Sequence, residues 1–124
     1  MDRKPIPKKT RLAVYEKCNH RCAYCGCKLE YKDMQVDHVI PLNGWNEQGP
    51  DTIENMLPAC RSCNHYKSRS TLEEFRKMVE AMPDTLMRDS VTYKNAVRFG
   101  LIIPNKHPVT FYFEEMEKNF CWVR

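Results

Sequence analysis

Two Cys-x-x-Cys pairs, Cys22/Cys25 and Cys60/Cys63, limit what this chain can fold into more than any other feature of its sequence. Two residues between the cysteines of a pair let the backbone turn so that both sulfur atoms face one ion. Gly26 directly follows the first pair and can adopt the positive φ angle that such a turn requires. Four thiolates around one Zn²⁺ leave no open coordination position, so the sequence predicts a structural zinc site.

Three of the seven cysteines, Cys18, Cys27 and Cys121, lie outside the two pairs, and we interpret them as free thiols. Cys27 is close enough in sequence to compete as a zinc ligand, but it lies outside the Cys-x-x-Cys register. In a reducing compartment, an odd number of cysteines that includes two Cys-x-x-Cys pairs favours metal binding over disulfides. Four buried cysteines without a ligand are the weaker alternative.

The formal net charge of the chain is +4, and four thiolates with one Zn²⁺ would lower it to about +2. A polyanionic partner must therefore be met by local clusters of basic residues instead of by overall charge. No apolar run approaches the roughly 20 residues that a membrane span needs, and the basic N-terminus lacks the apolar stretch of a secretion signal. We expect a cytoplasmic protein with reduced thiols and no membrane partner.

The length favours a single domain of residues 1–124. Within it we expect a basic flexible arm at 1–9, a core at 10–83 and a supporting extension of helix and strand at 84–124. The basic residues in and beside the arm are Arg3, Lys4, Lys8, Lys9 and Arg11. They suit contact with a phosphate backbone and equally suit a solubilising tail, so both interpretations stay open.

Hydrophobic periodicity and turn residues predict short alternating elements and an α+β fold. In chain order, we expect a helix at 10–18, a strand at 34–40 ended by Pro41, a polar loop at 43–54, a strand at 56–59, a helix at 60–69, a helix from the Ser70-x-x-Glu73 capping box to Pro83, a helix at 84–100 and a strand at 109–114. Trp45 in the polar loop fits a packing anchor better than a stacking platform.

Asp37 and His38 are neighbours on a predicted strand, so their side chains are expected to point to opposite faces. A carboxylate is a hard oxygen ligand that suits Mg²⁺ or Mn²⁺. An imidazole with a pKa near 6.5 suits proton abstraction at neutral pH. One metal ligand and one general base are two of the functions that phosphodiester hydrolysis needs.

The pattern C-x-x-C, D-H-V-I-P and E-N-M-L-P-A-C-R-S-C-N-x-x-K resembles the HNH endonuclease family, whose core is the ββα-metal fold. The similarity runs from about Arg11 to about Val79, and several independent motifs occur in the family's order. The resemblance implies a small zinc-stabilised ββα-metal (HNH) core with flanking helices, to which our pattern analysis adds the C-terminal β-strand.

The resemblance also implies roles for individual residues. His38 matches the general base, and Asn55 matches the central asparagine that braces the loop and helps to fix this base. Asp37 and Asn64 match the two ligands of a catalytic Mg²⁺ or Mn²⁺. Because many relatives have histidine at the position of Asn64, this chain is an H-N-N variant. Lys67 matches a family lysine and is expected to hold flanking phosphates.

Two further cations on or beside the same helix, Arg61 and Arg69, are candidates for nucleic-acid contact, and Arg61 could instead offset charge on the zinc thiolates.

We expect an endonuclease that nicks or cleaves DNA, most simply double-stranded DNA. The alternative is a catalytically silent zinc module that binds nucleic acid or protein. A silent module would be expected to lose Asp37, His38 or Asn64, and all three are present. The small size and the lack of a recognisable reader motif fit a phage or restriction component that a protein partner targets.

Overall fold

The computed structural model describes residues 5–123, with side chains through residue 117. It divides into two compact units, the first formed by Met1–Leu72 with Thr110–Arg124 and the second by Glu73–Val109. The division into arm, core and extension stays a prediction. Arg3 and Lys4 of the basic arm, and the side chain of Cys121, lie outside the described residues.

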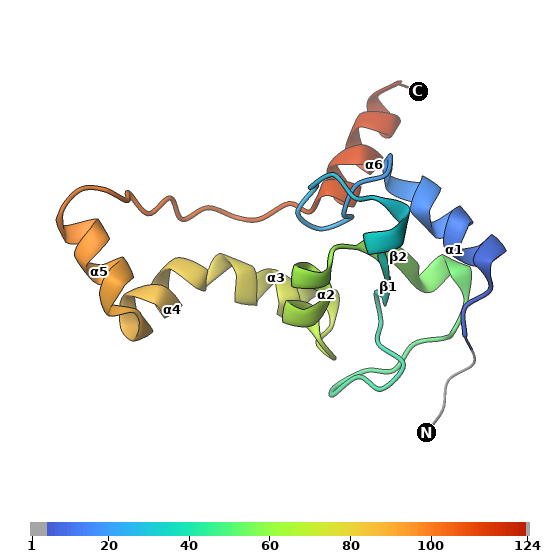
Figure 1. Ribbon diagram of the computed structural model, residues 1–124, viewed down its shortest axis with the longest axis horizontal. Helices are drawn as coiled ribbons and strands as arrows, with labels where there is room; N and C mark the ends of the chain where they lie inside the picture. The colour runs from blue at the N-terminus through green and yellow to red at the C-terminus, as the bar shows by residue number, and fades with distance from the viewer. Residues whose placement is uncertain (1–4, 124) are drawn as a thin grey trace. The chain divides into compact units, whose positions relative to one another are not determined.

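The first unit is built on an antiparallel hairpin of β1 (Gln35–His38) and β2 (Met56–Ala59), in which Gln35 pairs with Ala59 and His38 with Met56. Helix α1 (Lys8–Tyr15) contacts β2, and α2 (Arg61–Lys67) contacts β1 (Figure 1). Short 3₁₀ turns lie at Glu16–Cys18, Tyr31–Asp33 and Ile53–Asn55. These elements confirm the α+β class that the sequence predicts.

A small apolar core holds α1 on the hairpin. Val14 of α1 is buried with Leu29, Met34 and Met56. The side chain of Lys17, which follows α1, donates hydrogen bonds to the carbonyl oxygens of Ile53 and Met56. The core therefore fixes the hairpin from one side, and the polar residues of β1 remain available for a site. The expected packing role of Trp45 is wrong, since its side chain is 60% exposed.

The strand expected at 109–114 is wrong, because helix α6 (Tyr112–Val123) begins there. Among residues 5–123 no strand pairs with this alternating run of apolar residues. The carboxylate of Glu114 instead accepts a hydrogen bond of 2.8 Å from the backbone N–H of Phe111. This contact is half of a capping box, which favours the start of a helix. The backbone N–H groups of Tyr112 and Phe113 donate to the carbonyl oxygens of Tyr24 and Ala23, so the segment returns to the first cysteine turn.

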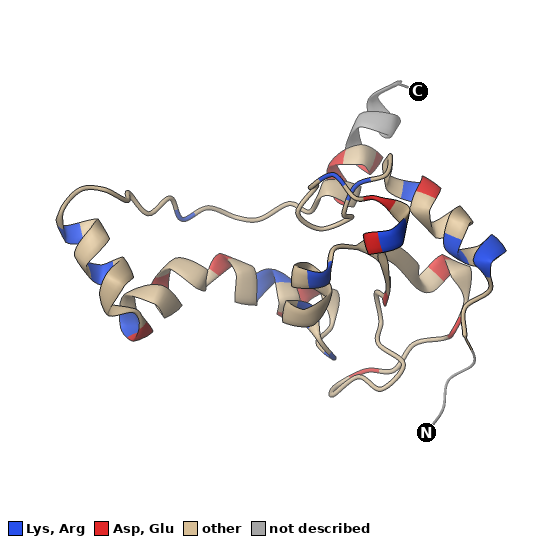
Figure 2. Cartoon of the chain, viewed as in Figure 1, with Lys and Arg blue, Asp and Glu red and all other residues tan. Residues whose placement is uncertain are grey.

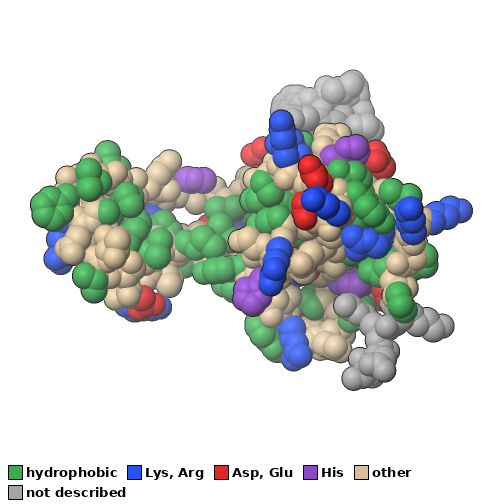
Figure 3. Space-filling view, viewed as in Figure 1, with side chains coloured by type: hydrophobic (Ala, Val, Ile, Leu, Met, Phe, Trp, Pro, Cys, Tyr) green, Lys and Arg blue, Asp and Glu red, His purple; other side chains and the backbone are tan. Residues whose placement is uncertain are grey.

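The second unit contains most of α3 (Leu72–Glu80), then α4 (Met82–Asp89) and α5 (Val91–Arg98). The single helix expected at 84–100 is two helices, because the Ser90 hydroxyl accepts from the Tyr93 N–H and caps a new one. Hydrophobic side chains lie on the surface of this unit (Figure 3), and Ile103 is 85% exposed. No helix among residues 5–123 is both long and apolar enough to cross a membrane.

Candidate functional site

The two cysteine pairs meet at one point. The sulfur atoms of Cys22, Cys25, Cys60 and Cys63 all lie within 4.8 Å of one another. Gly26 has the expected positive φ of 79°, which lets the first pair turn inward. Backbone N–H groups point at two of the sulfur atoms, from Tyr24 to Cys22 and from Cys63 to Cys60, each at 3.4 Å. Such contacts stabilise thiolates in preference to neutral thiols.

This geometry fits a tetrahedral zinc ion. Zn–S bonds of about 2.3 Å in a tetrahedron place two sulfur atoms about 3.8 Å apart, and the sulfur atoms of Cys25 and Cys60 are 3.9 Å apart. The hydrogen bond from the Cys63 thiol lowers the pKa of Cys22 to about 4, while burial raises the pKa of Cys25 to about 12. Four such crowded sulfur atoms become thiolates together only when a cation balances them, and their arrangement is one that could hold a metal ion.

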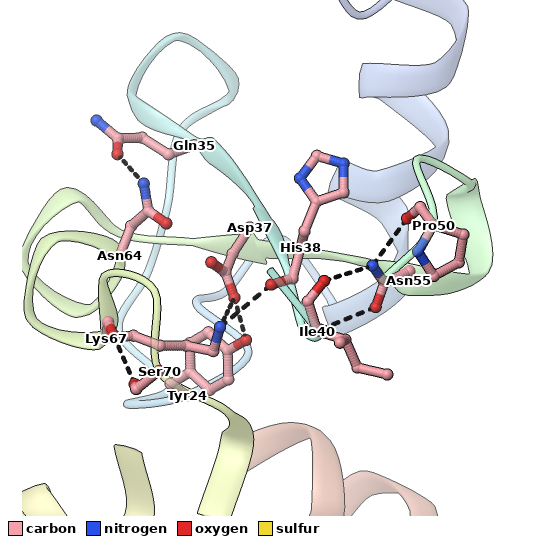
Figure 4. Close-up of polar contacts among 10 residues, drawn as sticks. All are labelled: Tyr24, Gln35, Asp37, His38, Ile40, Pro50, Asn55, Asn64, Lys67 and Ser70. Atoms are coloured by element: carbon pink, nitrogen blue, oxygen red, sulfur yellow. Dashed lines mark hydrogen bonds and ion pairs between the residues drawn. The ribbon is translucent and has the colours of Figure 1, made fainter. Parts of the chain in front are cut away.

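Asp37 lies in a buried polar pocket beside β1. One carboxylate oxygen, Oδ2, accepts a short hydrogen bond from the Tyr24 hydroxyl and pairs with the Lys67 ammonium at 3.2 Å. Burial raises the pKa of Asp37, and Lys67 and Tyr24 offset part of this rise. Figure 4 shows the other oxygen directed toward Asn64. The carboxylate is thus fixed through one oxygen, and the second is suitably placed to bind a cation.

Lys67 does not reach solvent, so its predicted contact with flanking phosphates is wrong. Its side chain is fully buried, and its ammonium donates to the backbone carbonyl of His38 at 3.1 Å as well as pairing with Asp37. The ammonium therefore holds β1 and the carboxylate in place from α2. Tyr24, the other partner of Asp37, was not predicted as a site residue, and no local motif indicates its role.

We expect Lys67→Met to lower the free energy of unfolding by about 3–5 kcal/mol, because it leaves the Asp37 carboxylate buried without its cation. Methionine keeps an unbranched apolar stem of similar length in the same space. Chemical denaturation at constant zinc concentration measures the loss. The matched control is Lys32→Met, whose side chain is 77% exposed and whose replacement should change stability by less than about 0.5 kcal/mol. A loss for Lys67→Met as small as that of the control would contradict the assigned ion pair.

Asn64 lies on α2, opposite β1. Its side-chain amide donates a hydrogen bond of 2.6 Å to the side-chain oxygen of Gln35, which fixes the orientation of the amide (Figure 4). The amide oxygen of Asn64 is then the atom left for a ligand. Asp37 and Asn64 together supply two hard oxygen atoms, which suit Mg²⁺ or Mn²⁺. Gln35 is a second supporting residue that was not predicted, since its partner is remote in sequence.

Asn55 joins the two ends of the loop after β1. Its side-chain oxygen accepts from the backbone N–H of Ile40 at 2.9 Å, and its amide donates to the carbonyl oxygens of Ile40 at 2.8 Å and Pro50 at 2.9 Å (Figure 4). The side chain is buried. These contacts are consistent with the bracing role that the resemblance implies for this asparagine.

The side chain of His38 points in a different direction from that of Asp37, and its ring is directed away from Lys67 and Tyr24 (Figure 4). The ring is largely buried, and its Nε2 atom lies 2.8 Å from a carboxylate oxygen of Asp51. Asp51 was not predicted as a site residue. Burial shields the imidazole from bulk water, and the carboxylate fixes the ring.

Exposed basic residues lie on two helices of the first unit and beside them. Arg61 and Arg69 are exposed at the two ends of the α2 region, so both stay candidates for nucleic-acid contact. Figure 2 shows further basic positions along α1, whose sequence is KKTRLAVY. Lys8 and Lys9 therefore lie in the first turn of this helix.

Comparison with known families matches residues 22–70 of this chain to the family described as HNH endonuclease. The matched segment contains both cysteine pairs, the β1–β2 hairpin, α2 and the polar residues around Asp37 and His38. The resemblance that the motifs indicate is confirmed over this segment. The match supports a nuclease function in general.

Curated relatives match less than half of the chain. Septu protein PtuB of Bacillus thuringiensis is 37% identical over 62 residues, which are 46% of this chain and 23% of that protein. The CRISPR-associated endonuclease Cas9 of Corynebacterium diphtheriae is 31% identical over 60 residues, 48% of this chain and 5% of Cas9. The SPbeta prophage-derived protein YoqL of Bacillus subtilis is 31% identical over 70 residues, 49% of this chain and 30% of YoqL. The similarity thus spans less than a third of each relative.

A solved structure also matches the fold. The Type II-C Cas9 enzyme from Actinomyces naeslundii aligns with a TM-score of 0.50 and 24% sequence identity. The alignment covers 62% of this chain and 9% of Cas9. This likeness supports the ββα arrangement of the hairpin and α2.

Proposed function

We propose that this chain, whose residues 22–70 match the HNH endonucleases, is a divalent-metal-dependent endonuclease that hydrolyses phosphodiester bonds in double-stranded DNA. One observation carries the proposal: Asp37 and Asn64 are each fixed through one side-chain atom, and each keeps an oxygen for a cation close to His38 on β1. This donor set suits a hydrolytic metal site, and the next residue of β1 after Asp37 supplies an imidazole as base.

In this proposal, His38 removes a proton from the attacking water. Asp37 and Asn64 would hold Mg²⁺ or Mn²⁺, which when bound neutralises charge on the scissile phosphate. Lys67 holds the carboxylate of Asp37 in position without touching the substrate. Asn55 keeps the loop after β1 closed, so that the imidazole stays in one orientation. Arg61 and Arg69 would contact phosphates on either side of the cleaved bond.

The four-cysteine cluster has a separate, structural role in the proposal. Its zinc ion would join the turn after Cys22 to the start of α2, and so place Asn64, which directly follows Cys63, opposite β1. We place the protein in the cytoplasm, where thiols stay reduced. The prophage-derived relative supports a role among phage or mobile-element proteins, and a protein partner would supply the targeting.

Supercoiled plasmid DNA tests the proposed function. We expect the purified zinc-loaded protein to nick or cleave the plasmid when Mg²⁺ or Mn²⁺ is added, and EDTA to stop the reaction while zinc content stays unchanged. Agarose gels resolve the supercoiled, nicked and linear forms, and the zinc is quantified by elemental analysis. Binding of the plasmid without any cleavage in either ion would favour the catalytically silent zinc module.

A further inference from the structure

Asp51 lies thirteen residues after His38, yet its carboxylate meets the imidazole at 2.8 Å from Nε2. The His38 side chain is 5% exposed and that of Asp51 is 50% exposed. The ring is thus largely buried, and Asp51 is the more exposed member of the pair. A carboxylate in this place accepts a hydrogen bond from Nε2–H, and in the neutral imidazole this leaves the lone pair on Nδ1.

The loop that carries Asp51 is fixed where it returns to β1. Asn55 donates to the carbonyl oxygen of Pro50, next to Asp51, and to that of Ile40, two residues after His38. The backbone N–H of Gly49 donates to the carbonyl oxygen of Pro41 at 2.9 Å. Hydrogen bonds therefore join the backbone that follows His38 to the backbone that precedes Asp51.

Gly49 shows how closely the two backbone segments approach. A Cβ atom at this position would lie 2.6 Å from both the Cβ and the carbonyl oxygen of Ile40, and 2.9 Å from the Asn55 amide. Only glycine fits this approach without a backbone shift. The close packing brings Pro50 and Ile40 to the same asparagine, and so keeps Asp51 within reach of the imidazole.

We propose that Asp51 is a positioning residue, which holds His38 through Nε2 so that Nδ1 is the nitrogen that takes the proton from water. The inference rests on the proposed nuclease function. A proton passes from water to Nδ1, the electron pair left on the water oxygen forms the new bond to phosphorus, and the bond to the leaving sugar oxygen breaks with its electron pair. The Asp51 carboxylate stabilises the imidazolium formed in this step.

The kinetic test compares Asp51→Ala with Glu47→Gln. Glu47 is an exposed acidic residue of the same loop, so its replacement also removes one negative charge without touching the imidazole. We expect Asp51→Ala to lower kcat for plasmid cleavage by about 10- to 100-fold with KM little changed, and Glu47→Gln to match the wild type. Unchanged zinc content and thermal midpoint in Asp51→Ala show that it is folded.

An NMR signature tests the contact itself without DNA. The zinc-loaded wild type should show a downfield, slowly exchanging imidazole N–H proton, assigned to His38 by its loss in His38→Ala. We expect the signal to persist in Glu47→Gln and to vanish in Asp51→Ala. An Asp51→Ala protein that cleaves as fast as the wild type, or faster because the carboxylate obstructs the base, overturns the positioning role and leaves the nuclease function standing. A wild type that shows the signal but never cleaves DNA defeats the nuclease function and, with it, the catalytic role of Asp51.

Discussion

Replacing His38 with alanine is expected to lower the rate of plasmid cleavage by about 100- to 10,000-fold, the range that a general base contributes. The change removes the imidazole but keeps the backbone carbonyl of residue 38 that accepts from Lys67. Zinc binding should be unaffected, because the four sulfur ligands lie in other segments. Initial rates of loss of supercoiled DNA, at saturating Mg²⁺ or Mn²⁺, measure the effect.

The matched control is His107→Ala, which removes an exposed imidazole from the second unit. We expect it to cleave at the wild-type rate, which excludes a general effect of removing a histidine. The loss in His38→Ala, purified in the same way, excludes a contaminating nuclease. Circular dichroism and zinc content confirm that both variants are folded. A fully active His38→Ala protein would rule out this residue as the base.

The second large effect is expected for Cys60→Ser, which should lose both zinc and the folded state. A four-thiolate zinc site contributes on the order of 10 kcal/mol to folding, comparable to the roughly 5–15 kcal/mol that stabilises a whole domain. Cys60 also caps α2 through its sulfur atom. Elemental analysis of zinc, together with circular dichroism before and after a strong chelator, measures the loss.

Cys27→Ser is the control for this experiment. Cys27 is exposed next to the first cysteine pair but is not among the four clustered ligands. We expect the variant to keep one zinc ion per chain and a wild-type melting temperature. Loss of zinc from Cys27→Ser, or a wild type that folds without any metal, would contradict the assigned ligand set.

Local signals in the sequence were sufficient for the central elements. The Cys-x-x-Cys spacing predicted the cluster. Strands were predicted at 34–40 and 56–59 and a helix at 60–69, where the structure has β1, β2 and α2. These signals work because turn geometry and side-chain periodicity depend on neighbours in the chain. The same reasoning failed at residues 109–114, where a strand pattern without a partner strand became the start of α6.

The sequence by itself determined the two cysteine pairs, the approximate places of β1, β2 and α2 and the polar residue types along β1 and α2, since each is encoded by spacing within one short segment. Only the tertiary structure decided their surroundings. Folding buried Lys67 against Asp37 and brought Asp51 to His38. These contacts depend on how the loop and the hairpin pack. The spacing of residues within one segment does not predict which side chains of different segments come into contact.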